Sequence, residues 1–140
     1  ELDLCNEEIV GKDNHQKLSI VYKNDDGEII AGLLGGTYWG WLYVDRLWVH
    51  KDYRKKGIGK QLLEYAEDEG IKRGCEYCHL DTMSWQALGF YQKQKYIVKC
   101  EIENIPKGYS KYHLRAPLKT HYRFARMSFF LRFWPSGNQP

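Results

Sequence analysis

No run of about 18 apolar residues occurs in the 140-residue sequence, so no transmembrane helix is expected. The first residues, Glu1, Leu2 and Asp3, lack the basic and apolar regions of a signal peptide. The cytoplasm is therefore the expected location, and the four cysteines of the sequence are most simply free thiols. A net charge of +3 is too small to indicate a nucleic-acid partner. Without an internal repeat or linker, the length fits one ordinary domain.

The first half of the chain is rich in short strand patterns. Asp26-Gly27 favours the positive φ values of a tight hairpin turn, and β-forming residues lie on both sides of it. After residue 58 the apolar spacing becomes helical, with Gly74 as a natural stop. The predicted elements are strands at Leu18–Tyr22, Glu28–Tyr38 and Trp41–Val49, followed by a helix from Ile58 to about Arg73.

The second half continues the alternation of strands and helices. We expect strands at Tyr77–Asp81, Tyr96–Ile102 and Tyr109–Arg115, and a helix at Trp85–Lys93 with Ser84 as its N-cap. The order βββαβαββ predicts an α/β sandwich. Residues 1–118 would form the domain, and residues 119–140 a basic, aromatic extension. That extension is interpreted as an amphipathic helix on a membrane or partner, as a segment packed on its own domain, or as a disordered tail.

The stretch DYRKKGIGK, residues 52–60, joins the strand that ends at Val49 to the helix that begins near Ile58. The first amides of a helix have no internal partners, and the helix dipole gives them partial positive charge. Gly57 and Gly59 would let a ligand approach the backbone closely. The loop also carries four cations, Arg54, Lys55, Lys56 and Lys60. This combination predicts a phosphate site, most simply for a pyrophosphate.

Two nucleotide motifs fail in this loop. A Walker loop needs Ser or Thr after its Gly-Lys pair, but Gln61 follows Gly59-Lys60, and Arg54 holds the place of the first glycine. A dinucleotide fingerprint needs a third glycine where this chain has Leu62. Neither nucleotide interpretation is supported.

The remaining pattern is [RQ]-x-x-G-x-[GA], filled by Arg54, Gly57 and Gly59. It resembles the acyl-CoA-binding loop of the GNAT superfamily of N-acyltransferases. The flanking segment Leu47–Thr82 is similar to that family's strand, loop, helix and next strand, and QALGFYQKQKY, Gln86–Tyr96, resembles its second helix. The similarity covers about Leu18 to Leu118, and the segment before it is short for the family. The resemblance implies a mixed, mostly antiparallel central sheet flanked by helices.

The resemblance also implies transfer of an acetyl group from acetyl-CoA to a primary amine. The main chain of Leu47, Trp48 and Val49 would pair with the pantetheine arm, and Arg54 would position the loop. The amides of Lys55, Lys56, Gly57, Ile58, Gly59 and Lys60 would hold the pyrophosphate. Ser84 and Gln86 would face the arm or the thioester, Phe90 would pack beside the cofactor, and Tyr91 would protonate the departing thiolate. Tyr91 could instead be an aromatic residue packed on the sheet.

The base that accepts the amine proton is left open among three residues. Strand alternation places Asp45 on the same side as Tyr43 and Leu47. His50 has the more suitable intrinsic pKa, and Asp81 is a third candidate. Asp45 could simply pair with a surface cation, and His50 could be exposed to solvent.

One residue departs from the family pattern. The turn between the second helix and the following strand normally has glycine where this chain has Lys95. Lysine adopts a left-handed conformation only with strain, so we expect this turn to differ locally.

Other signals compete with this assignment. CEYCH, residues 75–79, matches the c-type haem attachment pattern, but it falls at the start of a strand and no export signal is visible. A zinc site needs more ligands than this pair of cysteines, so no metal is expected. The alternative function is a non-catalytic module with the same fold that binds acyl-CoA or a partner.

The acceptor is not identified by the sequence beyond a small-molecule or peptide amine. A set of aromatic residues could line a pocket for it or could belong to the core: Tyr38, Trp39, Trp41, Tyr43 and Trp85. The short segment before Leu18 and the aromatic extension after Leu118 favour a homodimer, in which the extension would cover exposed sheet or helix surface.

Overall fold

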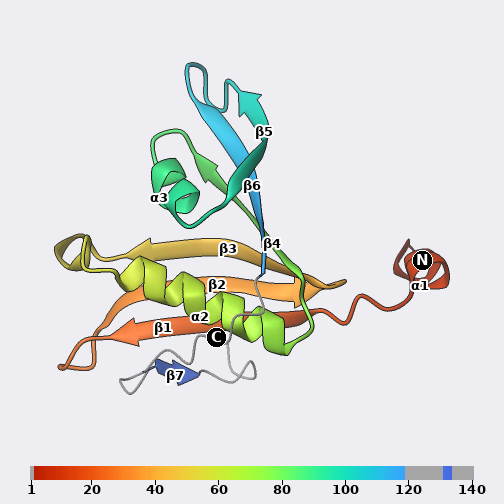
Figure 1. The fold of residues 1–140 in the computed structure, drawn as a ribbon, viewed down its shortest axis with the longest axis horizontal. Coiled ribbons are helices and arrows are strands. Elements are labelled where there is room, and N and C mark those ends of the chain that lie inside the picture. The colour runs from red at the N-terminus through yellow and green to blue at the C-terminus, as the bar shows by residue number, and fades with distance from the viewer. Residues whose placement is uncertain (1, 119–130, 134–140) are drawn as a thin grey trace.

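The computed structural model describes residues 2–118 and 131–133 (Figure 1). Its elements in chain order are α1 (Leu2–Val10), β1 (Gln16–Lys23), β2 (Ile29–Tyr38), β3 (Trp41–Val49), the 3-10 helix η1 (Lys51–Tyr53), α2 (Ile58–Lys72), β4 (Tyr77–Met83), α3 (Leu88–Lys93), β5 (Ile97–Glu103), β6 (Ser110–Pro117) and β7 (Leu131–Phe133). No helix in the described part of the chain is long and apolar enough to cross a membrane.

The described strands form one sheet in the order β5-β6-β4-β3-β2-β1-β7. β3 and β4 run parallel, and the other neighbouring pairs of described strands are antiparallel. A parallel pair needs a crossover, which α2 supplies. The mixed, mostly antiparallel sheet expected from the sequence is therefore confirmed. Figure 1 shows the sheet dividing into two arms, one with β1–β3 and α2, the other with β4–β6 and α3.

Helix α2 covers one face of the sheet because its apolar residues recur every three or four positions. Its buried residues are Ile58, Leu62, Leu63, Ala66 and Gly70. A Cβ on Gly70 would lie 3.3 Å from the Cβ of Leu42, so the missing side chain lets α2 approach β3 closely. The helix ends as expected: Gly74 has φ 84°, and the Cys75 amide donates to the Gly70 carbonyl at 2.9 Å.

Helix α3 is shorter than the sequence predicts. It begins at Leu88, with Ala87 at the N-cap position, so the prediction of Ser84 as N-cap is wrong. The Ala87 amide donates instead to the Thr82 hydroxyl at 3.3 Å. Ser84 is held elsewhere, because its hydroxyl accepts a hydrogen bond from the Ser110 amide at 3.1 Å. The turn is thus tied to β4 through Thr82 and to β6 through Ser110, and Ser84 does not cap the helix.

Both ends of the described chain add elements that the sequence did not predict. Helix α1 was missed because apolar residues such as Leu4 and Ile9 are exposed, at 67% and 80%, and produce no buried periodic face. Figure 1 shows α1 set apart from the sheet, beyond the end of β2. In the extension, β7 pairs antiparallel with β1, with Val21 opposite Arg132. The remaining interpretations of the extension fall on residues 119–130 and 134–140, which lie outside the described residues.

Candidate active site

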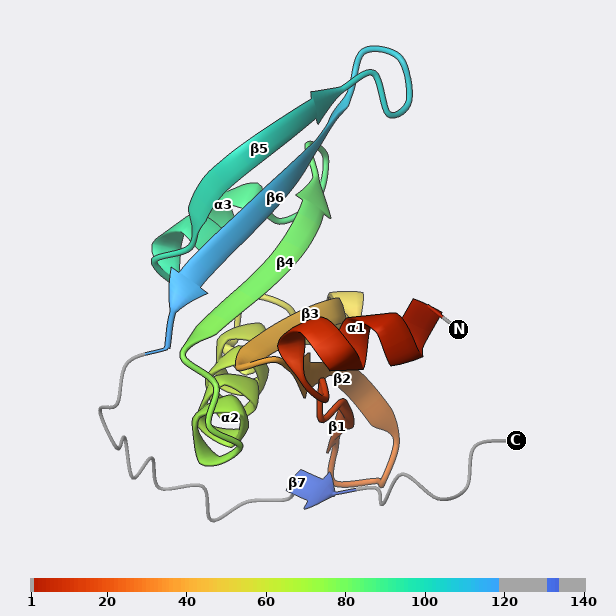
Figure 2. The ribbon, with the colours of Figure 1, turned by 90° about the vertical axis from the view of Figure 1, so that its right-hand side faces the viewer.

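The site begins where two parallel strands separate. β3 and β4 pair from Trp41 opposite Tyr77 to Val44 opposite Leu80. Beyond these pairs β3 continues to Val49 and β4 to Met83. Figures 1 and 2 show the two strands diverging into the two arms of the sheet. The carboxyl ends of β3 and β4 therefore border a split in the sheet, and the loop at residues 52–60 follows one of them.

A β-bulge at Asp45 marks the start of the split. Val44 lies opposite Gly35 and Arg46 opposite Leu34, so Asp45 is the extra residue. A Cβ on Gly35 would collide with the Tyr43 carbonyl oxygen, which explains the glycine in β2. Because of the bulge, the expectation that Tyr43, Asp45 and Leu47 lie on one side of the strand is wrong for Leu47. Leu47 packs against the core and no longer shares a face with Tyr43.

The Asp45 carboxylate itself stays close to Tyr43. Burial raises the pKa of Tyr43, and the negative charge of Asp45 adds to that rise. Asp45 is exposed, and its Oδ2 lies 3.8 Å from Nε of Arg46. The other two base candidates are also in ordinary surface contacts: His50 Nδ1 accepts from the Asp52 amide at 3.3 Å, and Asp81 Oδ2 lies 3.8 Å from Lys111 Nζ.

The backbone of β3 offers polar groups to the split. The His50 amide donates to the Ile30 carbonyl at 2.7 Å, so residues 48 and 50 direct their backbone groups toward β2. Because strand residues alternate, Leu47 and Val49 direct theirs toward the opposite edge, which is the split. The Val49 carbonyl accepts from Arg54 Nε at 2.9 Å. The other backbone groups of Leu47 and Val49 on this side form an edge to which an extended ligand can add like a further strand.

The loop before α2 has the geometry of an anion site. Lys55 and Gly57 have φ values of 62° and 81°, and the right-handed helix α2 begins directly after Gly57. A left-handed residue therefore precedes a right-handed one, as in a backbone nest. The first bond of α2 runs from the Gln61 amide to the Gly57 carbonyl at 3.0 Å, so the amides of residues 58–60 precede the helical ladder. No side chain caps this terminus. Dipole and free amides together favour an anion.

The cations of the loop surround this terminus. Arg54, Lys55, Lys56 and Lys60 are exposed. Lys60 Nζ lies 3.9 Å from Glu64 Oε1, and the Lys56 ammonium lies 5.4 Å from the centre of the Tyr53 ring. These contacts are weak at an exposed site, so the positive charge stays available to a ligand.

Three distant segments meet at Gly59. A Cβ on this residue would lie 3.6 Å from Val49 Cγ2 and 3.7 Å from Phe90 Cζ. The loop, the end of β3 and helix α3 therefore converge at the mouth of the split. Of the residues that the sequence proposed for the cofactor, the structure brings these three together directly.

Ser84 and Gln86 lie at the tip of β4, in a different setting. Besides the Ser84 contact with Ser110, Gln86 Oε1 accepts from the Met83 amide at 3.1 Å. Both residues are exposed. Their side chains hold the turn between β4 and α3.

Tyr91 lies on α3 and is 5% exposed. Its ring packs 5.1 Å from that of Phe90 and 5.9 Å from that of Tyr96, measured between centres. Burial raises the pKa of Tyr91 to about 12, with Cys78 and Asp81 adding to the shift. The phenol is therefore a proton-bearing group throughout the neutral range.

The turn after α3 keeps the left-handed conformation despite its lysine. Lys95 has φ 71° and its amide donates to the Gln92 carbonyl at 3.0 Å. The Tyr96 amide donates to the Tyr91 carbonyl at 3.1 Å, which completes a Schellman motif. The expected local departure is therefore wrong: the surrounding bonds and the Tyr91–Tyr96 contact hold Lys95 in place.

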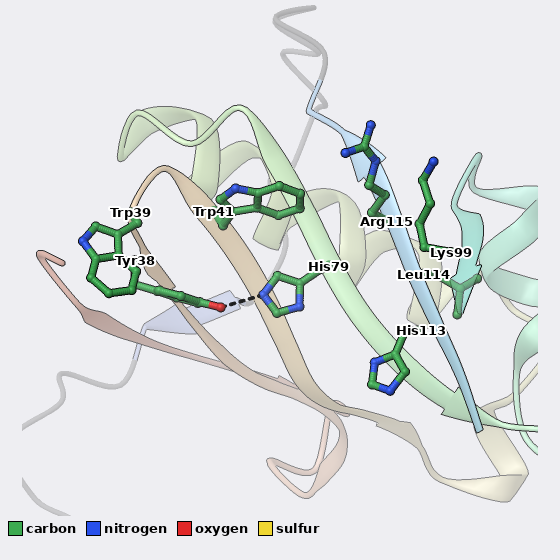
Figure 3. A pocket seen from close by; sticks show the side chains of 8 residues that line it. All are labelled: Tyr38, Trp39, Trp41, His79, Lys99, His113, Leu114 and Arg115. Carbon is green, nitrogen blue, oxygen red and sulfur yellow. Dashed lines mark hydrogen bonds between the residues drawn. The ribbon is translucent and has the colours of Figure 1, made fainter. Parts of the chain in front are cut away.

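A hollow of about 480 Å³ lies on the face of the sheet that carries His79 (Figure 3). The sequence suggested Tyr38, Trp39 and Trp41 as pocket or core, and they line it. Tyr38 OH and His79 Nε2 lie 3.0 Å apart, and burial lowers the pKa of His79. Tyr43 contacts Tyr38 edge-on nearby, whereas Trp85 packs on Tyr109. Sequence reasoning missed the basic residues of the hollow, because they come from later strands.

The C-x-x-C-H residues do not form a common site. Cys78 is fully buried on the core side of β4, whereas His79 points to the opposite face, as successive strand residues must. The four cysteines, all in the described part of the chain, are free. No group of three potential metal ligands occurs among the described residues.

Comparison with known proteins agrees with this geometry. The model of the acetyltransferase (GNAT) family matches residues 2–96. An acetyltransferase of Agrobacterium fabrum is 42% identical over 83 residues, which are 59% of this chain and 61% of that protein. Blasticidin-S acetyltransferase of Streptomyces morookaense is 37% identical over 89 residues, 63% of this chain and 65% of that protein. The chain thus spans less than two thirds of the length of each of these relatives.

A solved structure extends the similarity beyond the matched segments. The crystal structure of an acetyltransferase from Bacillus cereus superimposes with a TM-score of 0.80 and 34% sequence identity, covering 84% of this chain and 86% of that one. Because the family model covers more than half of the sequence, the chain belongs to the GNAT acetyltransferase family.

Proposed function

We propose that this chain transfers the acetyl group of acetyl-CoA to a primary amine by direct attack. The observation that carries the proposal is the convergence at Gly59 of an uncapped helix terminus, the open edge of β3 and helix α3. Bound acetyl-CoA supplies an activated thioester. The amides of residues 55–60 hold its pyrophosphate, and Phe90 packs beside it. Leu47 and Val49 pair with its pantetheine arm through the open edge of β3, whereas the backbone of Trp48, also expected to pair with the arm, faces β2. Ser84 and Gln86 hold the turn that faces the same split.

In the reaction the amine nitrogen bonds to the thioester carbonyl carbon, and the carbon–sulfur bond breaks. The backbone N–H of Val49 faces the split and stabilises the oxygen that becomes negative. Burial raises the pKa of Tyr91 to about 12, so its phenol carries a proton at neutral pH, and it gives this proton to the departing thiolate. The products are the acetylated amine and free CoA, and Tyr91 regains a proton from solvent.

Asp45 is the proposed acceptor of the amine proton, directly or through water. The bulge turns it out of the regular strand at the point where β3 and β4 separate. The Asp45→Asn variant should lose the acidic limb of its pH–rate profile. A profile with that limb intact would remove Asp45 and leave His50 and Asp81 as the candidates.

The test of the reaction is release of CoA with a panel of small amines and peptide N-termini. The Tyr91→Phe variant should lose at least about 100-fold in kcat, the usual contribution of a positioned acid. Its KM for acetyl-CoA should be unchanged, and Tyr65→Phe, at a partly buried tyrosine of α2, serves as the matched control. Acetyl-CoA binding without turnover of any amine would instead favour a non-catalytic acyl-CoA-binding module.

The proposal includes the organisation of the chain. Residues 1–118 form the acetyltransferase domain and residues 119–140 the extension, of which β7 joins the sheet beside β1. The acceptor is a small-molecule or peptide amine, the location is the cytoplasm, and the chain forms a homodimer. Light scattering that gives a monomeric mass would contradict the dimer.

A further inference from the structure

The hollow beside His79 has two chemically different walls. Tyr38, Trp39 and Trp41 come from the turn between β2 and β3 and present aromatic rings. Lys99 of β5 and Arg115 of β6 lie across from them, with His79 between, as Figure 3 shows. The rings offer flat apolar surface, and the two basic side chains offer full positive charge.

The charges decide what such a hollow can bind. An aromatic cage alone would suit a cation. Here, however, Lys99 and Arg115 line the same space, and neither has a carboxylate partner within the described residues. The Arg115 guanidinium only contacts the ring of Tyr77, 5.4 Å from its centre. The nearest acid on β4, Asp81, lies by Lys111. The hollow therefore repels a cation and attracts an anion.

The hollow also borders the candidate active site. His79 lies opposite Tyr43 in the parallel pair that precedes the split, and Asp81 follows two residues later. At about 3.3 Å per strand residue, the step from His79 to Asp81 is roughly 7 Å. The step from Trp41 to Asp45 is roughly 13 Å. A ligand seated in the hollow and long enough to span this step can therefore extend its amine into the split.

We propose that this hollow binds the planar, anionic part of the acceptor: an aromatic or heteroaromatic ring that carries a carboxylate or phosphate group. The ring stacks on Trp41 and Trp39, and the anion pairs with Arg115 and Lys99. The amine projects past His79 toward Asp45. This inference rests on the proposed acetyl transfer, whose acceptor it assigns to anionic aromatic amines and not to polycations.

The test uses three phenylethylamines that differ in charge at the para position. 4-(2-Aminoethyl)benzoate carries a carboxylate there, 2-phenylethylamine carries hydrogen, and 4-(2-aminoethyl)benzylamine carries an ammonium group. Dissociation constants are measured by calorimetry on the full chain saturated with CoA. The Trp41 indole N–H resonance reports whether the ligand occupies the hollow. Since a charged hydrogen bond contributes about 1.5–3 kcal/mol, the benzoate should bind at least about tenfold more tightly than either other amine.

The variants Lys99→Gln and Arg115→Gln should each reduce this preference, and the double variant should abolish it. Lys107→Gln, which removes the same charge from the turn between β5 and β6, is the matched control and should keep it. Equal affinities for the three amines, preference for the diammonium compound, or no saturable binding would overturn the inference. So would a preference that survives the double variant.

Failure of this inference is distinguishable from failure of the proposed reaction, because CoA binding is measured on the same samples. A protein that binds CoA but shows no charge preference contradicts the acceptor assignment alone. A protein that does not bind CoA contradicts the proposed reaction and, with it, the role of the hollow as an acceptor site.

Discussion

The same substitution at two glycines of the loop should have opposite effects. Gly57 has φ 81°, and a Cβ there would meet no atom within 4 Å, so the cost of alanine is conformational alone. Gly59 lies inside α2, where a Cβ would make ordinary contacts at 3.6 Å and beyond. The two alanine substitutions therefore differ in the backbone conformation that they require and not in steric crowding.

The magnitudes follow from the backbone. A left-handed conformation costs an L-residue about 1–2 kcal/mol, so Gly57→Ala should lower the free energy of unfolding by about 1 kcal/mol. Gly59→Ala should leave it unchanged or raise it by up to about 1 kcal/mol, because alanine is the better helix former. If the chain at Gly57 relaxes to negative φ, the adjacent amides turn away from the phosphate site. Losing one charged hydrogen bond should weaken CoA binding about tenfold.

Urea denaturation and calorimetric titration with CoA measure both quantities on the same proteins. Gly59→Ala serves as the matched control for stability, because it adds the same methyl group two residues away. CoA affinity unchanged in Gly57→Ala, or a loss of stability in Gly59→Ala as large as that in Gly57→Ala, would refute this prediction.

Two further predictions concern stability. Lys95→Gly should raise the free energy of unfolding by about 1 kcal/mol, because it relieves the left-handed strain of the lysine. Gln92→Gly inside α3 should lower it by about as much. Urea denaturation that shows the same loss of stability in both variants would contradict this prediction. Burial raises the pKa of both Cys78 and Tyr91 to about 12, from 9.0 and 10.0, so the unfolded chain releases these protons more readily. Stability should therefore be intact below pH 9.0 and fall as pH rises toward about 12, by up to about 1.4 kcal/mol per pH unit for each group. In Tyr91→Phe, the free energy of unfolding measured in urea should fall less steeply as pH rises. An equally steep fall in this variant would refute the contribution of Tyr91.

Local signals predicted the elements around the site. The helical spacing from Ile58 to Gly70 and the stop at Gly74 depend on residues close in sequence, and the structure confirms both. The alternation of Trp41–Val49 identified β3 for the same reason. Glycines and cations in one short loop predicted an anion site at the helix terminus, and the structure places a terminus without a side-chain cap there.

Features that depend on pairing between distant segments were not predictable in this way. The bulge at Asp45 exists because Gly35 of the neighbouring strand allows close approach, so the faces of Asp45 and Leu47 could not be read from alternation. The hollow likewise joins the turn between β2 and β3 to Lys99 and Arg115, which are far away in the sequence. Helix α1 buries no apolar face from which periodicity could reveal it.

The central claim is that the amides at the start of α2 hold the diphosphate of CoA while the edge of β3 holds its pantetheine arm. Amide nitrogen–proton correlation spectra, recorded during titration with CoA and with pantetheine, test it most directly. We expect CoA to shift the resonances of residues 57–60 together with those of Leu47 and Val49, and pantetheine to shift only the latter two. Resonances at 57–60 that do not respond to CoA, while others do, would contradict the account.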